Sequence, residues 1–203
     1  MHDAKMLPPT YILAGGRSRR FGSDKARALV EGVSLLVRLT EQLKGLTPRV
    51  TIIADTPDKY TDLGLQVIVD TVPNQGPIGG LLTALEHEPN LGWILLMSCD
   101  LLDLPRTELQ ALMPLCTPNV HAVAYRSDTG WQPLPAFYHT NLIPLIREHI
   151  AAGRRALWQV LETTATAAAP CPPAWIEGMG ANTPAELRQF VERRQRKSPA
   201  SEA

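Results

Sequence analysis

The sequence predicts an α/β protein whose mainly parallel sheet is covered by helices on both faces, giving three layers. Short apolar runs that suit strands alternate along the chain with longer segments whose apolar residues recur at helical spacing. The 203 residues are enough for one substantial core and too few for two full domains. We therefore expect a single domain over residues 1–195, followed by a disordered tail at 196–203.

Bulk composition excludes several classes of function. Twenty basic and twenty acidic residues balance, so no overall field attracts nucleic acid or an acidic membrane surface. Three widely spaced cysteines without a CxxC pair favour a reducing compartment. The first nine residues offer no apolar core of a signal peptide, and the longest apolar run, 93–97, is too short to cross a bilayer. We expect a cytoplasmic protein that binds neither nucleic acid nor membrane.

The first strand, at residues 11–13, opens into a glycine-rich basic loop that ends at Lys25. Gly15 and Gly16 lack Cβ atoms, so their backbone N–H groups can approach an anion closely. The loop carries four cations, at Arg17, Arg19, Arg20 and Lys25. A lone glycine pair would suggest only a solvated turn, but this density of donors suits a polyphosphate, whose charge is spread over several oxygens.

Two better-known phosphate loops do not fit this segment. A P-loop requires Ser or Thr after its lysine, and Ala26 follows Lys25. A dinucleotide-binding turn requires GxGxxG, whereas Gly16 and Gly22 enclose five residues, RSRRF. The spacing therefore excludes an NAD-dependent dehydrogenase.

The middle of the chain continues the alternation. Residues 34–46 carry a leucine stripe at helical spacing, and 50–54 and 67–69 read as strands, the second ending at Asp70. A glycine-rich turn at 74–80 then precedes a helix that stops before Pro89. Glycines at a helix start let its free N–H groups face a ligand, although a plain turn would look the same.

Residues 93–99 form the most apolar stretch and predict a central strand that ends at Asp100. A carboxylate at the carboxyl end of such a strand lies where open α/β sheets bind ligands, and it is a hard oxygen donor that suits Mg²⁺. The alternative role is a cap for the following helix, for which Asp103 is better placed. We predict that Asp100 binds Mg²⁺.

The last part of the domain contains further helices and strands. Helical patterns occupy 108–115, 142–150 and 157–161, strands are expected at 120–125 and 133–138, and the polar segment 127–132 is expected to be mobile and could form a lid.

Between the last two helices, Arg154 and Arg155 are either helix-end charges or a clamp for a phosphorylated acceptor, and both interpretations stay open. Residues 163–173 read as a loose connector, and Thr183, Pro184 and Glu186 as a helix-capping box.

The segment LAGGRSRRFGSDK at 13–25 resembles the signature of sugar-phosphate and molybdopterin nucleotidyltransferases. Five later motifs run in the order seen in molybdenum cofactor guanylyltransferases: GPIGG (76–80), SCD (98–100), QPLPAFY (132–138), GRR (153–155) and NTPAEL (182–187). The resemblance covers the chain from Tyr11 to about Phe190. It implies a Rossmann-like sheet of the nucleotide-diphospho-sugar transferase type, and transfer of GMP from GTP to the terminal phosphate of molybdenum-bound molybdopterin with release of pyrophosphate.

The resemblance also implies roles for individual residues. The backbone of Leu13, Ala14 and Gly15 would hold the nucleotide. Lys25 and Arg20 would neutralise phosphate charge, and Asp70 would contact the nucleoside. Asp100 would bind both Mg²⁺ and the nucleotide. Candidates for binding the acceptor are Arg154, Arg155 and Asn182. Since the acceptor phosphate is already ionised near neutral pH, neither a protein nucleophile nor a general base is required.

Some positions depart from the family pattern and leave alternatives open. Ile53 replaces a polar residue at the end of the second strand and Asp55 follows it, so base recognition stays open. Gly180 and Leu102 also differ from the pattern. The alternatives are a cytidylyltransferase, a nucleotidyltransferase for another phosphorylated acceptor, or a non-catalytic nucleotide-binding module. Implied partners are GTP, a molybdopterin-type acceptor and, transiently, molybdoenzymes or their chaperones.

Overall fold

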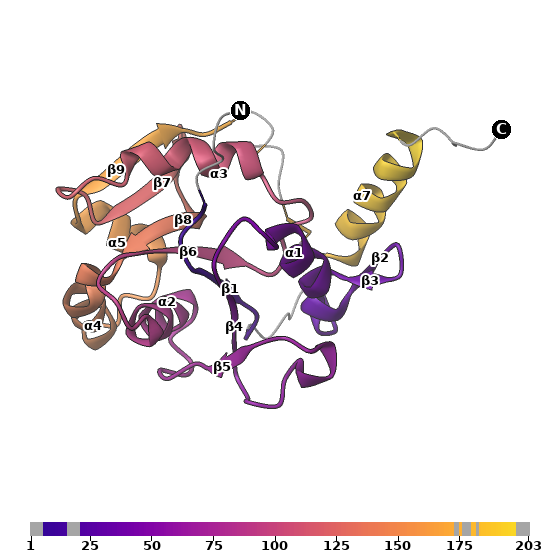
Figure 1. Ribbon diagram of the computed structural model, residues 1–203, viewed down its shortest axis with the longest axis horizontal. Coiled ribbons are helices and arrows are strands. Elements are labelled where there is room, and N and C mark those ends of the chain that lie inside the picture. Colours follow the sequence, from indigo (N-terminus) through magenta and orange to yellow (C-terminus); the bar gives the residue numbers. More distant parts are fainter. Residues whose placement is uncertain (1–5, 16–20, 173–174, 176–179, 182, 198–203) are drawn as a thin grey trace.

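The computed structural model describes residues 6–15, 21–172, 175, 180–181 and 183–197, and these form an α/β fold around one large sheet (Figure 1). The sheet has seven strands in the order β5-β4-β1-β6-β8-β7-β9. Their bounds are β1 Thr10–Leu13, β4 Val50–Ala54, β5 Val67–Val69, β6 Trp93–Ser98, β7 Ala122–Ser127, β8 Gly130–His139 and β9 Thr166–Pro170. Only β8 runs antiparallel to its neighbours. The predicted mainly parallel sheet is confirmed.

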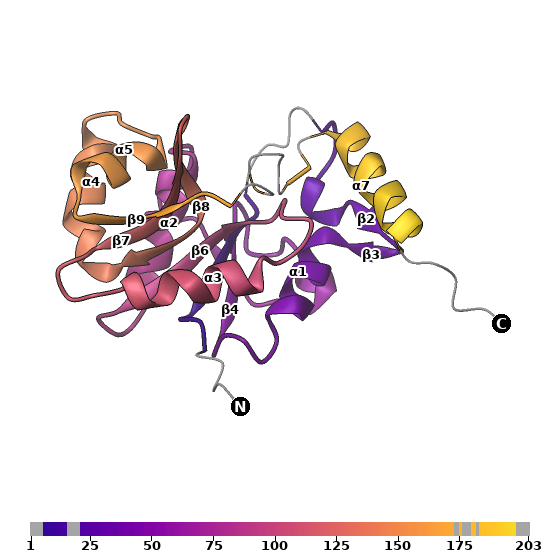
Figure 2. The same cartoon turned by 90° about the horizontal axis from the view of Figure 1, so that it is seen from above.

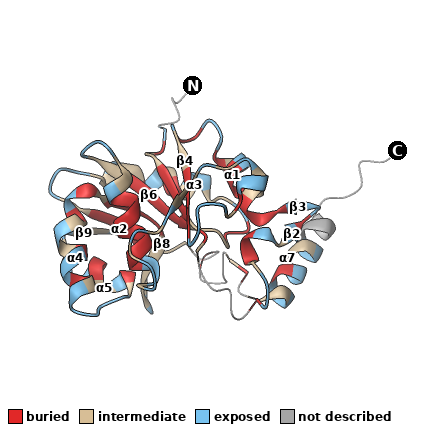
Figure 3. Cartoon of the chain, turned by 90° about the horizontal axis from the view of Figure 1, so that it is seen from below, coloured by how far each residue is buried: buried red, intermediate tan, exposed pale blue. Residues whose placement is uncertain are grey.

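Helices cover both faces of the sheet, as expected. On one face α1 (Leu35–Leu43) and α3 (Arg106–Leu112) pack into one apolar cluster, and on the other α2 (Pro77–His87), α4 (Ile143–Ala151) and α5 (Leu157–Thr163) pack into a second. Along β6 the side chains alternate between the two clusters, so this strand is buried on both sides (Figure 3). No helix in the described part of the chain combines the length and apolar character that a bilayer span requires.

A smaller unit lies at one end of the sheet, beyond α1 (Figure 2). The hairpin of β2 (Leu29–Val30) and β3 (Val33–Ser34) packs there against α7 (Pro184–Lys197) through a third apolar cluster. Thr183 Oγ1 accepts a hydrogen bond of 3.2 Å from the N–H of Glu186, which confirms Thr183 as the cap of α7. The helix extends to Lys197, past the predicted domain boundary at 195.

Three segments differ from the sequence prediction. The hairpin β2–β3 was not expected. Its turn, Glu31–Gly32, has positive φ at both positions, as tight hairpins require. Residues 127–132 do not form a separate mobile segment, since β7 and β8 pair up to Ser127 and Gly130 around a tight turn. The connector at 163–173 contains the edge strand β9, which pairs through its backbone with β7.

Candidate active site

The predicted phosphate-binding lysine and the predicted metal-binding aspartate lie in direct contact. Lys25 opens the short 3-10 helix η1 (Lys25–Arg27), and Asp100 follows β6 at the carboxyl end of the sheet. Lys25 Nζ lies 2.6 Å from Asp100 Oδ2, and the two side chains are 10% and 23% exposed. Both interpretations of the sequence therefore point to a single site.

Lys25 is positioned by the residue before it. Asp24 caps η1 by accepting a hydrogen bond of 3.1 Å from the N–H of Ala26. The hydroxyl of Tyr60 lies 3.0 Å from both Asp24 carboxylate oxygens and 3.0 Å from the carbonyl oxygen of Ala14. Burial, reinforced by the Asp24 carboxylate, raises the pKa of Tyr60, so its hydroxyl remains a neutral donor. Tyr60 thereby ties the start of η1 to the end of β1.

The backbone of residues 13–15 is fixed between two neighbouring strands. The N–H of Ala14 donates to Ile53 on β4 at 2.9 Å, and the carbonyl of Leu13 accepts from Cys99 at 3.1 Å. The loop therefore leaves the sheet between β4 and β6. Leu13 is paired with Ser98, so Ala14 lies opposite Cys99, the residue before Asp100. Gly16 and the cations at 17–20, among them the predicted phosphate ligand Arg20, lie outside the described residues.

Asp70 stands at the end of β5, beside the start of α2. Its Oδ1 accepts hydrogen bonds from the N–H of Val72 at 2.9 Å and from Thr83 Oγ1 at 3.0 Å. A Cβ added to Gly79 would lie 2.7 Å from the carbonyl oxygen of Val72 and 3.4 Å from Asp70 Oδ2. Glycine at this position therefore allows α2 to approach the Asp70 turn closely. Oδ2 of Asp70 has no hydrogen-bond partner among the described residues.

The chain returns to this site near its carboxyl end. Gly180 forms an isolated antiparallel bridge with Leu101, and the N–H of Ala181 donates to the carbonyl of Asp100 at 3.3 Å. Asn182, predicted to bind the acceptor, follows immediately but lies outside the described residues. The two residues that precede it bring this segment against Asp100.

Arg154 and Arg155 do not contact Lys25, Asp70 or Asp100. They lie exposed in the turn between α4 and α5. β8 runs antiparallel to its neighbours, so it ends at the amino edge of the sheet, beside the start of β6. Helix α4 then runs back across the sheet, and the turn after it therefore lies at the carboxyl edge, the same edge as Asp100. Neither guanidinium forms an ion pair with a described residue.

The oxygen ligands available around Asp100 fit a magnesium ion that is bound partly by this carboxylate and partly by the phosphates of a nucleotide. Oδ2 meets Lys25, and Oδ1 has no hydrogen-bond partner among the described residues. Among the described residues, no group of three or more His, Cys, Asp or Glu side chains could hold a metal ion, and the three cysteines are free thiols. Mg²⁺ is commonly held by one or two carboxylates together with substrate phosphates and water. One carboxylate at this position is consistent with that pattern.

The sequence did not indicate two residues behind the loop. Tyr60 and Lys59 follow β4 in an irregular stretch, and Lys59 Nζ reaches Asp55 Oδ1 at 2.9 Å and the carbonyl oxygen of Ala14 at 3.5 Å. Their side chains approach the loop only because the segment after β4 folds back over it. No periodicity or motif around them signals that contact.

Comparison with known proteins agrees with this geometry. The MobA-like NTP transferase domain family matches residues 10–168. A Deinococcus radiodurans protein named "probable molybdenum cofactor guanylyltransferase" is 36% identical over 193 residues, which cover 91% of this chain and 95% of that protein. A Syntrophotalea carbinolica protein named molybdenum cofactor guanylyltransferase is 31% identical over 159 residues, covering 76% of this chain and 74% of its own length.

Solved structures share the fold at lower identity. Molybdopterin-guanine dinucleotide biosynthesis protein A from Archaeoglobus fulgidus superimposes with a TM-score of 0.76 at 21% identity, over 93% of this chain and 99% of that one. The 4-diphosphocytidyl-2C-methyl-D-erythritol synthase from Anaerococcus prevotii gives 0.71 at 10% identity, over 94% and 96% of the two chains. The sheet is thus the nucleotide-diphospho-sugar transferase fold, and the chain belongs to the MobA-like NTP transferase family.

Proposed function

We propose that this protein transfers GMP from GTP to the terminal phosphate of molybdenum-bound molybdopterin, giving the guanine dinucleotide and pyrophosphate. The observation that carries the proposal is the contact between Lys25 and Asp100 beside the backbone of Ala14 and Gly15. A phosphate-binding cation and a metal-binding carboxylate in one place are what a transfer between two polyanions needs. The similarity to proteins named as guanylyltransferases supports the same activity.

Each group in the site has a role in this proposal. The backbone of Leu13, Ala14 and Gly15 holds the nucleotide, and Asp70 meets its sugar through the free Oδ2. Lys25 exchanges its contact with Asp100 for the phosphates of GTP. Asp100 is the residue that would hold Mg²⁺, and the ion would supply positive charge that screens the two polyanions from each other. Arg20 would add a second cation to the phosphates.

Bond making and breaking need no protein nucleophile. An ionised oxygen of the acceptor phosphate attacks the α-phosphorus of GTP, and the bond from that phosphorus to the bridging oxygen of pyrophosphate breaks. Charge is conserved because pyrophosphate leaves as an anion. The protein contributes alignment and charge neutralisation, and these are the main sources of rate in phosphoryl and nucleotidyl transfer.

The acceptor would approach along the carboxyl edge of the sheet. Arg154 and Arg155 are exposed at this edge and form no ion pair with a described residue, so their guanidinium groups are available for a phosphorylated acceptor. Asn182 is a further candidate, because Gly180 and Ala181 lie against Asp100. We place the reaction in the cytoplasm, in keeping with three free thiols, and expect transient contact with molybdoenzymes or their chaperones when the product is delivered.

The test is turnover by the purified protein with Mg²⁺, molybdenum-bound molybdopterin and each of GTP, CTP, ATP and UTP. We expect pyrophosphate release with GTP, and a product whose mass equals that of the acceptor plus GMP less one water. Preference for CTP would replace the proposal with a cytidylyltransferase. Tight binding of GTP with no release of pyrophosphate from it in the presence of any acceptor would instead indicate a non-catalytic module.

A further inference from the structure

An ion pair between Asp55 and Lys59 lies directly behind the nucleotide-binding loop, and Lys59 Nζ also lies 4.0 Å from Asp24 Oδ2 and 5.4 Å from the centre of the Tyr60 ring. Asp55 follows β4, and its Oδ1 lies 2.9 Å from Lys59 Nζ. The Lys59 ammonium is also 3.5 Å from the carbonyl oxygen of Ala14. A Cβ added to Gly15 would come within 3.3 Å of the N–H nitrogen of Asp55. The pair therefore flanks the backbone that is proposed to hold GTP.

We expect the Asp55 carboxylate to add little to the stability of the fold. The Asp55 side chain is 57% exposed, and exposed ion pairs add little to stability because water screens them. The hydrogen bond from Lys59 keeps the pKa of the Asp55 carboxyl below its usual range. Asp55 is therefore ionised near neutral pH and can only accept hydrogen bonds. Lys59, in contrast, can only donate.

Ile53, next to last on β4, has no polar group with which to recognise a nucleotide base. Its side chain is buried, 2% exposed, in the apolar cluster under α2. It offers no hydrogen bond to a ligand. Asp55, the first residue after β4, is polar and its side chain is 57% exposed.

We propose that Asp55 is the residue that selects guanine, accepting hydrogen bonds from N1–H and the 2-amino group of the base, while Lys59 donates to the O6 carbonyl. The inference rests on the proposed function and names the basis of its nucleotide preference. Guanine presents two adjacent donors next to an acceptor, which complements a carboxylate beside an ammonium. Adenine and cytosine each present a ring nitrogen lone pair where guanine has N1–H, and that lone pair faces the carboxylate unfavourably.

The test is Asp55→Asn, measured as binding of GTP, ITP and XTP in the presence of Mg²⁺ by calorimetry. ITP lacks the 2-amino group, and XTP carries a carbonyl oxygen there. Wild type should prefer GTP to both. Asp55→Asn should bind GTP about tenfold or more weakly and gain affinity for XTP, because its amide N–H₂ can donate to the new carbonyl. The variant should therefore prefer XTP to GTP, whereas a purely structural role for Asp55 predicts that the preference for GTP is kept.

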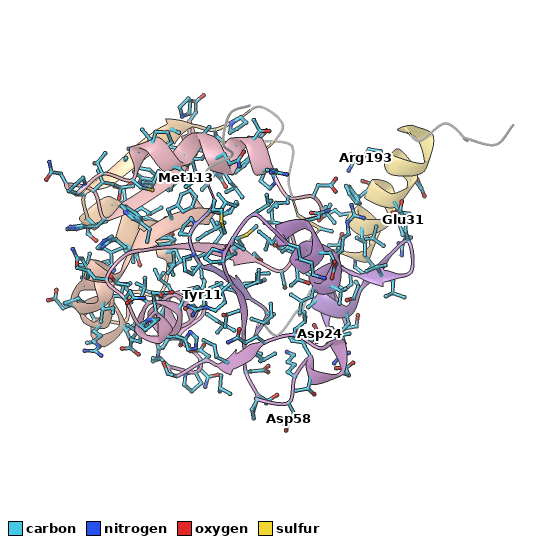
Figure 4. All side chains as sticks on the ribbon, in the orientation of Figure 1. Tyr11, Asp24, Glu31, Asp58, Met113 and Arg193 are labelled. Carbon is cyan, nitrogen blue, oxygen red and sulfur yellow. The ribbon has the colours of Figure 1, made fainter. Side chains whose placement is uncertain are left out.

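Asp58→Asn is the matched control, because Asp58 is an exposed carboxylate on the same segment. It lies at the outer tip of the segment between β4 and β5, away from Asp24 (Figure 4). We expect its nucleotide preference to equal that of wild type. If Asp55→Asn keeps the order GTP over XTP, the inference is wrong, even where wild type makes the guanine dinucleotide. If the order reverses but wild type releases no pyrophosphate with acceptor, the inference stands and the proposed transfer fails.

Discussion

Lys25 and Asp100 meet at 2.6 Å although they belong to different strand–loop units of the sheet. Each side chain is partly shielded from water, and an ion that loses hydration costs free energy unless an opposite charge compensates it. The contact satisfies both charges before substrate arrives. In the proposed reaction GTP with Mg²⁺ would present an anion and a cation together, so each side chain would exchange its partner for another of opposite charge.

Replacing either member of the pair should affect different steps. We expect Lys25→Met to weaken GTP binding, and Asp100→Asn to lower turnover by about a hundredfold or more and to remove its response to Mg²⁺. Each single variant also removes the opposite charge that faces a partially buried ion, so the double variant should recover some of the lost thermal stability. Calorimetric GTP binding, pyrophosphate release and thermal melts of the three proteins separate these effects. Mg²⁺-dependent turnover by Asp100→Asn at the wild-type rate would refute the metal role.

Tyr60 should matter for the geometry of the loop. Tyr60→Phe removes the hydroxyl that joins Asp24 to the carbonyl of Ala14, and we expect a loss of about 1–2 kcal/mol in unfolding free energy together with a raised KM for GTP. Tyr125→Phe is the control, because its hydroxyl donates to the carbonyl of Glu108 at 2.9 Å, outside the described site contacts. Urea melts should show comparable destabilisation in both variants. An equal change in KM for both would show that Tyr60 acts only through stability.

The sequence predicted those parts of the site that are set by the sheet itself. Asp70 and Asp100 end apolar runs, and parallel strands bring such ends to one edge, so their positions follow from pattern alone. Lys25 required the resemblance to a known signature, because a basic loop does not reveal its partner. Tyr60 and Lys59 were not identified, since their contacts with Ala14 depend on how an irregular segment folds back.

The same distinction explains the errors in secondary structure. β9 consists mainly of Ala with one Pro, residues whose strand preference is weak, and it forms because the edge of β7 offers a row of backbone partners. The turn at 127–132 has the polar composition of a mobile loop, yet strand pairing up to Ser127 and Gly130 fixes it. In both segments, tertiary pairing overrides local composition.

Gly79 should be required for the close contact between α2 and the Asp70 turn. In Gly79→Ala the new Cβ would lie 2.7 Å from the carbonyl oxygen of Val72, so the backbone has to move. We expect a cost of about 1–3 kcal/mol in unfolding free energy and weaker GTP binding through displacement of Asp70. Gly92→Ala, with no atom within 4 Å of the new Cβ, is the control and should bind GTP normally. Unchanged GTP affinity in Gly79→Ala would argue against a nucleoside contact at Asp70.

Stability should fall with acidification through His149. This side chain is fully buried between α4 and α5, where its Nε2 lies 3.0 Å from Thr163 Oγ1 and its Nδ1 has no hydrogen-bond partner among the residues that the structure describes. Burial, with a further contribution from Arg154, lowers the pKa of His149 below its ordinary value of 6.5. The unfolded chain therefore takes up a proton at a higher pH than the folded chain does.

It follows that the neutral imidazole contributes its full stability above about pH 6.5, and that this contribution is lost as the pH falls through the lowered folded-state pKa. His149→Gln can keep a hydrogen bond to Thr163 but cannot titrate in this range. Urea melts from pH 8 to pH 5 should show a shallower decline for the variant than for wild type. Parallel curves would assign the acid sensitivity elsewhere, and His139, whose pKa is also lowered by burial and by His121, would be the next residue to replace.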